Sequence, residues 1–204
     1  MIWAKNNRLN NSEVVEFWNW FTKNCQDFGS DFDNTSLLEE LDVRIKRLGN
    51  FSWEIGPGKT QENSLVISPN GDLELLPFTK KIIASAKNCE RWEYYYAKPP
   101  KEWEFKFEYS ISSGVKLEVD ASKWKYVLLR YEDELFQIII KSLHLTYISH
   151  EDKLAIAEIV LDGILGEEMR MQTIAEINLV EDFEILYRNK ASNITDLLNH
   201  LLTF

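Results

Sequence analysis

The spacing of apolar residues changes near residue 50, and this change constrains the fold more than any other feature of the chain. Between residues 12 and 48, apolar side chains recur every three or four positions, which places them on one face of an α-helix. From Phe51 onward they alternate with polar side chains, as in Phe51, Trp53 and Ile55, which is typical of a strand with one buried face. The sequence therefore predicts an N-terminal pair of helices followed by a region that contains several strands.

The N-terminal pair of helices is predicted to cover residues 12–27 and 37–48. Ser12 is the expected N-cap of the first helix. The second helix is expected to begin with a capping box, in which the Ser36 hydroxyl accepts a backbone N–H and Glu39 reaches back. Trp20 lies off the apolar stripe of the first helix and is therefore a candidate exposed aromatic residue.

The rest of the chain is predicted to contain both strands and helices. Strands are expected at residues 51–55, 65–68, 91–97, 103–110, 115–120, 124–131, 134–145 and 171–180, and helices at 75–88, 150–165 and 194–203. The short connection at Glu132-Asp133 predicts that the strands on either side of it pair as a hairpin. Together these elements favour an α+β fold, in which helices pack on a mostly antiparallel sheet.

The domain organisation is predicted to be simple. A chain of 204 residues is long enough to bury its own core, and it contains no linker, low-complexity tract or internal repeat. Pro99-Pro100 is the only conceivable boundary, and it is too short to separate two domains. Residues 1–204 are therefore predicted to form a single α+β domain, with its helical pair over about residues 12–48.

The chain is acidic, with 33 acidic and 23 basic residues and a net charge of −10. This charge repels a phosphate backbone, and no stripe of lysine and arginine offsets it, so nucleic acid is excluded as an expected partner. The same charge would attract a basic protein partner, although acidity is also a common route to solubility.

The two cysteines, Cys25 and Cys89, belong to no metal-binding or redox motif, so reduced, half-buried thiols are the expected state. No apolar run is long enough to span a bilayer, so no membrane partner is expected. The N-terminal residues also lack the apolar segment of a signal peptide. These features predict a cytoplasmic protein.

The segment Gly56-Pro57-Gly58-Lys59-Thr60 resembles the end of a Walker A phosphate-binding loop. That motif requires a glycine where Trp53 stands, and a helix immediately after the loop. Here the loop leads into the predicted strand at residues 65–68. A connection between two strands is therefore the favoured interpretation of this segment.

The strongest candidates for catalysis are carboxylates on and after the predicted helix at residues 150–165. Glu158 and Asp162 are four positions apart and share one face of that helix, Glu167 follows it, and His150 lies in its first turn. The alternative interpretation, which we favour, is that these groups form the solvated face of an amphipathic helix. His144, His150 and His200 are scattered, so neither a metal site nor a cofactor is expected.

Aromatic residues around Pro99-Pro100 are the best candidates for a binding surface. In a strand, Trp92, Tyr94 and Tyr96 share one face and Tyr95 lies on the other. Trp103, Phe105 and Phe107 share a face of the next strand. An exposed set of such side chains would anchor a protein interface, and the alternative is that both sets are buried. The predicted binding residues are Trp20, Trp92, Tyr94, Tyr95, Tyr96 and Trp103.

Several short segments resemble a family of uncharacterised bacterial proteins of about this size. They are Phe17-Trp18-Asn19-Trp20-Phe21, the segment from Phe51 to Pro57, the segment from Leu65 to Gly71, Trp92-Glu93 with Pro99-Pro100, and the segment from Leu161 to Glu167. The resemblance covers about residues 12–180. It implies a bacterial cytosolic protein with one α+β domain, and it brings no catalytic residues with it.

Three functions are compatible with these patterns. The favoured one is a non-catalytic protein-binding domain, of an inhibitor or immunity type, that holds a partner through an aromatic patch with an acidic rim. The alternative is a hydrolase or small-molecule-binding enzyme that uses the carboxylates near residues 150–168. The third is a structural protein that self-associates through its aromatic face.

Overall fold

The computed structural model describes residues 9–204, apart from residues 30, 143–144 and 146. The chain forms two compact units, Met1–Lys98 and Pro99–Phe204, so the boundary falls at the proline pair. Among the described residues there are six α-helices and nine strands in three sheets, and most strand pairs are antiparallel. The α+β fold class is confirmed, whereas the existence of one domain over residues 1–204 stays a prediction.

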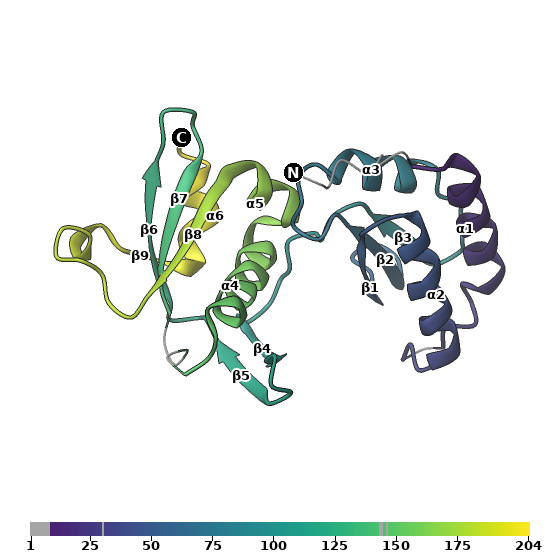
Figure 1. The fold of residues 1–204 in the computed structure, drawn as a ribbon, viewed down its shortest axis with the longest axis horizontal. Helices are drawn as coiled ribbons and strands as arrows, with labels where there is room; N and C mark the ends of the chain where they lie inside the picture. Colours follow the sequence, from purple (N-terminus) through teal and green to yellow (C-terminus); the bar gives the residue numbers. More distant parts are fainter. Residues whose placement is uncertain (1–8, 30, 143–144, 146) are drawn as a thin grey trace, which may run out of the picture. The chain divides into compact units, whose positions relative to one another are not determined.

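The N-terminal unit contains one three-stranded sheet and three helices, which can be followed in Figure 1. Strand β1 pairs with β2 in antiparallel register, and β2 pairs with β3 in parallel register because α3 crosses between them. Its elements in chain order are α1 (Asn11–Asn24), α2 (Thr35–Leu48), β1 (Ser52–Pro57), β2 (Asn63–Ser68), α3 (Leu76–Ala84) and β3 (Trp92–Tyr95).

The predicted apolar stripe of α1 does form the core of this unit. Trp18 and Phe21 are fully buried, and the indole N–H of Trp18 donates to the carbonyl of Ile82, at 2.8 Å. The Phe21 ring packs edge-on against Trp92, with ring centres 5.0 Å apart. The predicted N-caps of both helices are wrong. The side-chain oxygens of Asn10 and Asn34 cap α1 and α2, in place of Ser12 and Ser36.

The C-terminal unit contains a hairpin and a four-stranded sheet with the order β8-β7-β6-β9. The predicted hairpin of β6 and β7 is confirmed. Strand β8 lies parallel to β7 because α4 and α5 connect them. The elements are β4 (Lys106–Ser110), β5 (Lys116–Asp120), β6 (Lys125–Arg130), β7 (Phe136–Lys141), α4 (His150–Leu165), α5 (Glu167–Thr173), β8 (Ile174–Val180), β9 (Ser192–Asn193) and α6 (Leu197–Leu201).

Helix α4 begins and ends where the sequence predicts. The Ser149 hydroxyl accepts the backbone N–H of Asp152 at 3.0 Å, and Gly166 ends the helix with a φ of 78°. The predicted strand at residues 171–180 begins three residues later than expected, because α5 continues to Thr173. No helix in the described part of the chain is both long and apolar enough to cross a membrane.

The two faces of the β6–β7 pair differ in character. Tyr126 and Ile140 are opposite each other, fully buried, and part of a core that α4 and α6 complete. The neighbouring pair, Lys125 opposite Lys141, must point to the other face, because side chains alternate along a strand. The segment from Asp182 to Ala191, which follows β8 and is seen as a yellow loop in Figure 1, lies at this end of the sheet.

Candidate functional site

A basic pocket of about 450 Å³ lies in the C-terminal unit, at the β6 and β7 ends that carry Lys125 and Lys141. It is lined by Lys123, Lys125, Lys141, Asp182, Phe183, Arg188 and Ala191. The four basic side chains carry four positive charges and Asp182 carries one negative charge, which leaves a formal charge of +3. The chain as a whole carries −10, so the pocket reverses the average charge of the molecule.

Asp182 is shared by two of these cations. Lys141 Nζ lies 2.7 Å from one carboxylate oxygen, and Arg188 Nη2 lies 2.8 Å from the other. The hydrogen bond from Lys141 is the main cause that lowers the pKa of Asp182, and the charge of Arg188 adds to it. The carboxylate therefore stays ionised and holds two of the four cations in place.

Among the residues that the structure describes, neither Lys123 nor Lys125 has a carboxylate within 4 Å, although the charge of Lys123 helps to lower the pKa of Asp120. In addition, Lys125 is paired directly with Lys141 across the two strands. Like charges in directly opposite positions of an antiparallel pair destabilise the sheet. The repulsion between Lys125 and Lys141 therefore lowers the stability of the fold, and an anion bound in the pocket would offset this repulsion.

The side chains of this pocket are suited to binding anions. Its side chains present ammonium and guanidinium donors, which hold carboxylate or phosphate oxygens through charge-assisted hydrogen bonds. Among the described residues, no group of three or more His, Cys, Asp or Glu side chains is arranged to hold a metal ion.

Two of the carboxylates predicted for catalysis, those of Asp162 and the partly exposed Glu158, pair with Arg170. Arg170 Nε lies 2.5 Å from the carboxylate of Asp162, and its Nη1 lies 3.7 Å from Glu158. The side chains of Arg170 and Asp162 are only 7% and 8% exposed. The favoured interpretation, a solvated helix face, is therefore wrong for Asp162.

Glu167 is also fully buried rather than solvated, whereas His150 is exposed. His150 and Asp162 are twelve positions apart on α4, about 18 Å along the helix axis at 1.5 Å per residue, so they do not converge. His200 Nδ1 lies 2.8 Å from the Tyr126 hydroxyl, and His144 lies outside the described residues.

None of the six predicted binding aromatics is among the exposed residues. Trp92 is buried, and its indole N–H donates to the carbonyl of Cys25 at 3.1 Å. The half-buried Tyr94 packs against Trp18 with ring centres 4.8 Å apart, and burial raises the pKa of Tyr94 to about 12. Both residues thus serve the core of the N-terminal unit.

The other four predicted aromatics are half-buried, and each has a neighbour within its own unit. Arg44 stacks over Trp20 and Lys80 lies over Tyr96, at 4.7 and 5.0 Å from the ring centres. The Tyr95 hydroxyl donates to Glu93 at 2.9 Å. Trp103 packs so closely on Gly163 that a Cβ there would lie 2.5 Å from the indole.

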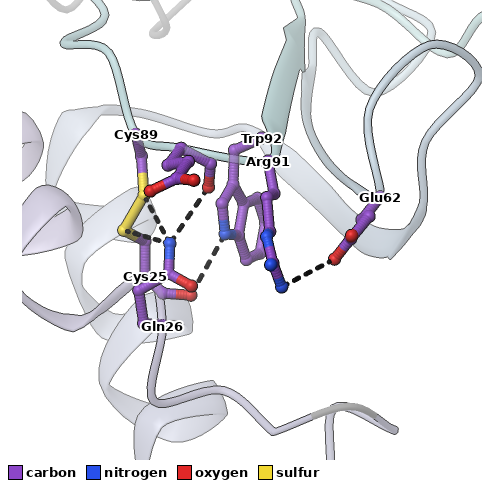
Figure 2. Close-up of polar contacts among 7 residues, drawn as sticks. Cys25, Gln26, Glu62, Cys89, Arg91 and Trp92 are labelled. Carbon is purple, nitrogen blue, oxygen red and sulfur yellow. Dashed lines mark hydrogen bonds and ion pairs between the residues drawn. A yellow bond between two sulfur atoms is a disulfide. The ribbon is translucent and has the colours of Figure 1, made fainter.

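Cys25 and Cys89 form a disulfide, so the expectation of two reduced thiols is wrong (Figure 2). The cysteines lie 64 positions apart, one at the end of α1 and the other before β3, and only the tertiary fold brings them together. Gln26 Nε2 donates to the carbonyl of Glu90 at 3.0 Å and lies 3.5 Å from the sulfur of Cys89. Both cysteines are buried, so the cross-link is part of the core.

The loop that resembles a Walker A end does connect two strands, as predicted, and it surrounds a carboxylate. The backbone N–H groups of Lys59, Thr60 and Gln61 donate to Glu93, and so does the Thr60 hydroxyl. Burial opposes ionisation of Glu93, but the donors outweigh it and lower its pKa to about 2. The loop is thus an anion-binding nest that the chain's own Glu93 occupies.

The basic pocket is the feature that the sequence analysis missed. Its cations are spread from residue 123 to residue 188, so no local run of Lys and Arg reveals them. The only local signal is Lys123-x-Lys125, which stands at the predicted start of a strand. Comparison of the chain with protein-family models, curated proteins and solved structures found no match, so the resemblance to a bacterial family stays a prediction.

Proposed function

We propose that this protein is a non-catalytic binding domain, and that its basic pocket holds an anionic group of the partner. The observation that carries the proposal is the cross-strand pair of Lys125 and Lys141, joined by Lys123 and Arg188 around the single carboxylate of Asp182. A bound carboxylate or phosphate would neutralise this excess charge and accept hydrogen bonds from the two unpaired lysines.

In this proposal the partner binds at the basic pocket, and not at the aromatic patch that the sequence predicted. The aromatic residues that the sequence nominates are buried or half-buried, and they pack against their own unit. A binding anchor has to be reachable in the free protein. The basic partner and the self-association suggested by the net charge and the aromatic residues stay predictions for other parts of the surface.

An enzyme is the weaker candidate. The carboxylates of Glu158 and Asp162, which would act as acid and base, pair with Arg170. His150 lies about 12 Å from Glu158 and about 18 Å from Asp162 along the axis of α4. A general base must lie within hydrogen-bond reach of the proton that it removes. These groups are better explained as a structural network.

The compartment is part of the proposal. Disulfides persist in oxidising compartments and are rare in the reducing cytosol. The buried bond between Cys25 and Cys89 therefore favours a protein that acts outside the reducing cytosol, in contrast to the cytoplasmic location expected from the sequence.

An NMR titration with inorganic phosphate tests the proposal. At constant ionic strength, the amides of residues 123–125, 141 and 182–191 should shift in a saturable manner. Replacement of both unpaired lysines, Lys123→Gln with Lys125→Gln, should weaken binding about tenfold or more, because each charge-assisted bond is worth roughly 1.5–3 kcal/mol.

The matched control replaces two exposed lysines of the β4–β5 hairpin, Lys106→Gln with Lys116→Gln, which changes the net charge by the same amount in the same unit. Binding should be unchanged in this variant. Equal loss of affinity in both double variants would mean that only the overall charge matters, and the proposal would then be wrong.

A further inference from the structure

The segment that forms one wall of the basic pocket also carries the most exposed aliphatic side chain among the described residues. Ile185 is 83% exposed and its neighbour Leu186 is 58% exposed, between the pocket residues Phe183 and Arg188. The Arg188 Nε donates to the carbonyl of Phe183 at 3.2 Å, which closes this segment into a loop. A turn from Glu184 to Tyr187 places the two aliphatic residues at its outer end.

We propose that the ligand of the pocket is an acidic segment of a protein partner, which carries an aliphatic side chain that packs on Ile185 and Leu186. This inference rests on the proposed function, since it assigns the chemistry of the partner to the same site. Charge complementarity argues for it: the pocket carries a formal charge of +3, and two of its lysines make no ion pair within 4 Å among the described residues.

The exposed side chains of Ile185 and Leu186 indicate which kind of anion the pocket binds. A free phosphate or a small dicarboxylate would fill the pocket and leave Ile185 and Leu186 in water. A peptide with both kinds of side chain would bury them, and burial of apolar area is the main favourable term in most protein association. The pairing of a charged pocket with an apolar neighbour therefore fits a polypeptide best.

Nucleic acid fits this surface poorly. Single strands are bound on aromatic side chains that stack with bases, whereas the exposed side chains here are aliphatic. Two exposed carboxylates, that of Glu184 in this segment and that of Glu181 directly before it, would repel a continuous phosphate backbone. A peptide can place its charges only where the lysines lie.

Fluorescence anisotropy with two labelled peptides tests the inference. One peptide contains glutamates around two central leucines, and the other has serines in place of the leucines. The full chain should bind the leucine peptide about tenfold more tightly, because partial burial of one leucine already supplies the required difference. The double substitution Ile185→Ser with Leu186→Ser should abolish this preference and leave phosphate binding unchanged.

The matched control is Val43→Ser with Leu73→Ser, which replaces two exposed aliphatic residues of the other unit and should keep the preference. Equal binding of both peptides would overturn the inference while the proposed function stands, provided that phosphate still binds. Failure of every anion to bind would overturn both.

Two further results would overturn the inference by naming another occupant. The first is tighter binding of a single-stranded oligonucleotide than of either peptide. The second is self-association, measured by sedimentation without peptide, that the Ile185→Ser and Leu186→Ser substitutions abolish. In that case a second copy of the chain would be the partner.

Discussion

Among single residues, Glu93 has the most distinctive environment in the N-terminal unit. Its carboxylate accepts three backbone N–H groups and two hydroxyls, and these donors hold the loop between β1 and β2 against β3. Gly58 is the first residue of this loop, and a Cβ there would lie 2.8 Å from the Glu93 carboxylate and 2.5 Å from the carbonyl of Gln61. The anchor therefore depends on a charged acceptor and on a residue without a side chain.

We expect Glu93→Gln to lower the free energy of unfolding by about 1–3 kcal/mol at neutral pH, because hydrogen bonds to a charged acceptor are lost. The pKa of Glu93 falls from 4.5 to about 2 on folding, so its contribution is complete above pH 4.5. It is lost as the pH falls from 4.5 toward 2. Urea unfolding across this range should therefore show the wild type and the variant converging.

Glu90→Gln is the matched control, because Glu90 is an exposed neighbour of the same type and charge. It should unfold like the wild type at every pH. A difference between wild type and Glu93→Gln that stays constant down to pH 2 would contradict the electrostatic origin of the effect. The sequence could identify the loop but not its anchor, because Glu93 lies more than thirty positions further along the chain.

At the scale of elements, local sequence patterns predicted where helices and strands lie, but they did not predict the register between paired strands. Periodicity located α1 and α2 to within a few residues, because each buries one apolar face. It also located α4, although residues 160–165 of this helix are buried on every side. The β6–β7 hairpin was also predicted, but a two-residue connection at Glu132-Asp133 would set Lys125 opposite Ile140. In the structure Glu134 also belongs to the turn, where it has a φ of 70°. The connection is therefore one residue longer than predicted, and this places Lys125 opposite Lys141.

The disulfide makes a prediction about the N-terminal unit. A cross-link between residues 64 positions apart restricts the unfolded chain, and chain-entropy estimates put its contribution at about 4 kcal/mol. We expect Cys25→Ala with Cys89→Ala to lower the free energy of unfolding by roughly this amount, measured in urea. A reducing agent should destabilise the wild type and leave the double variant unchanged.

Thiol alkylation followed by mass spectrometry supplies the direct check on this bond. Protein isolated without a reducing agent should show no reactive thiol after unfolding. Two alkylated cysteines under those conditions would contradict the disulfide and return the thiols to the reduced state that the sequence suggested.

At the scale of the whole molecule, the described apolar residues form two separate cores. One is built from residues of the N-terminal unit and the other from residues of the C-terminal unit. The proline pair at the boundary was visible in the sequence, but its short length favoured one domain. Composition and periodicity report that residues are buried, and they do not report which residues are buried together.

Separate cores predict a local response to reduction. Hydrogen exchange with mass spectrometry, in the presence of a reducing agent, should show faster exchange in peptides from residues 9–98 and little change in peptides from residues 99–204. The double cysteine variant should give the same pattern without the reducing agent. An equal rise in both units would show that they unfold as one cooperative domain.

The order of the pocket residues along the chain has a consequence for the timing of activity during synthesis. Lys123, Lys125 and Lys141 leave the ribosome well before Asp182 and Arg188, which complete the wall. Until then Lys141 lacks the carboxylate of Asp182, and the pocket lacks the wall that residues 182–191 form. Under the proposed function, a nascent chain can therefore capture a partner only after Arg188 has left the ribosome.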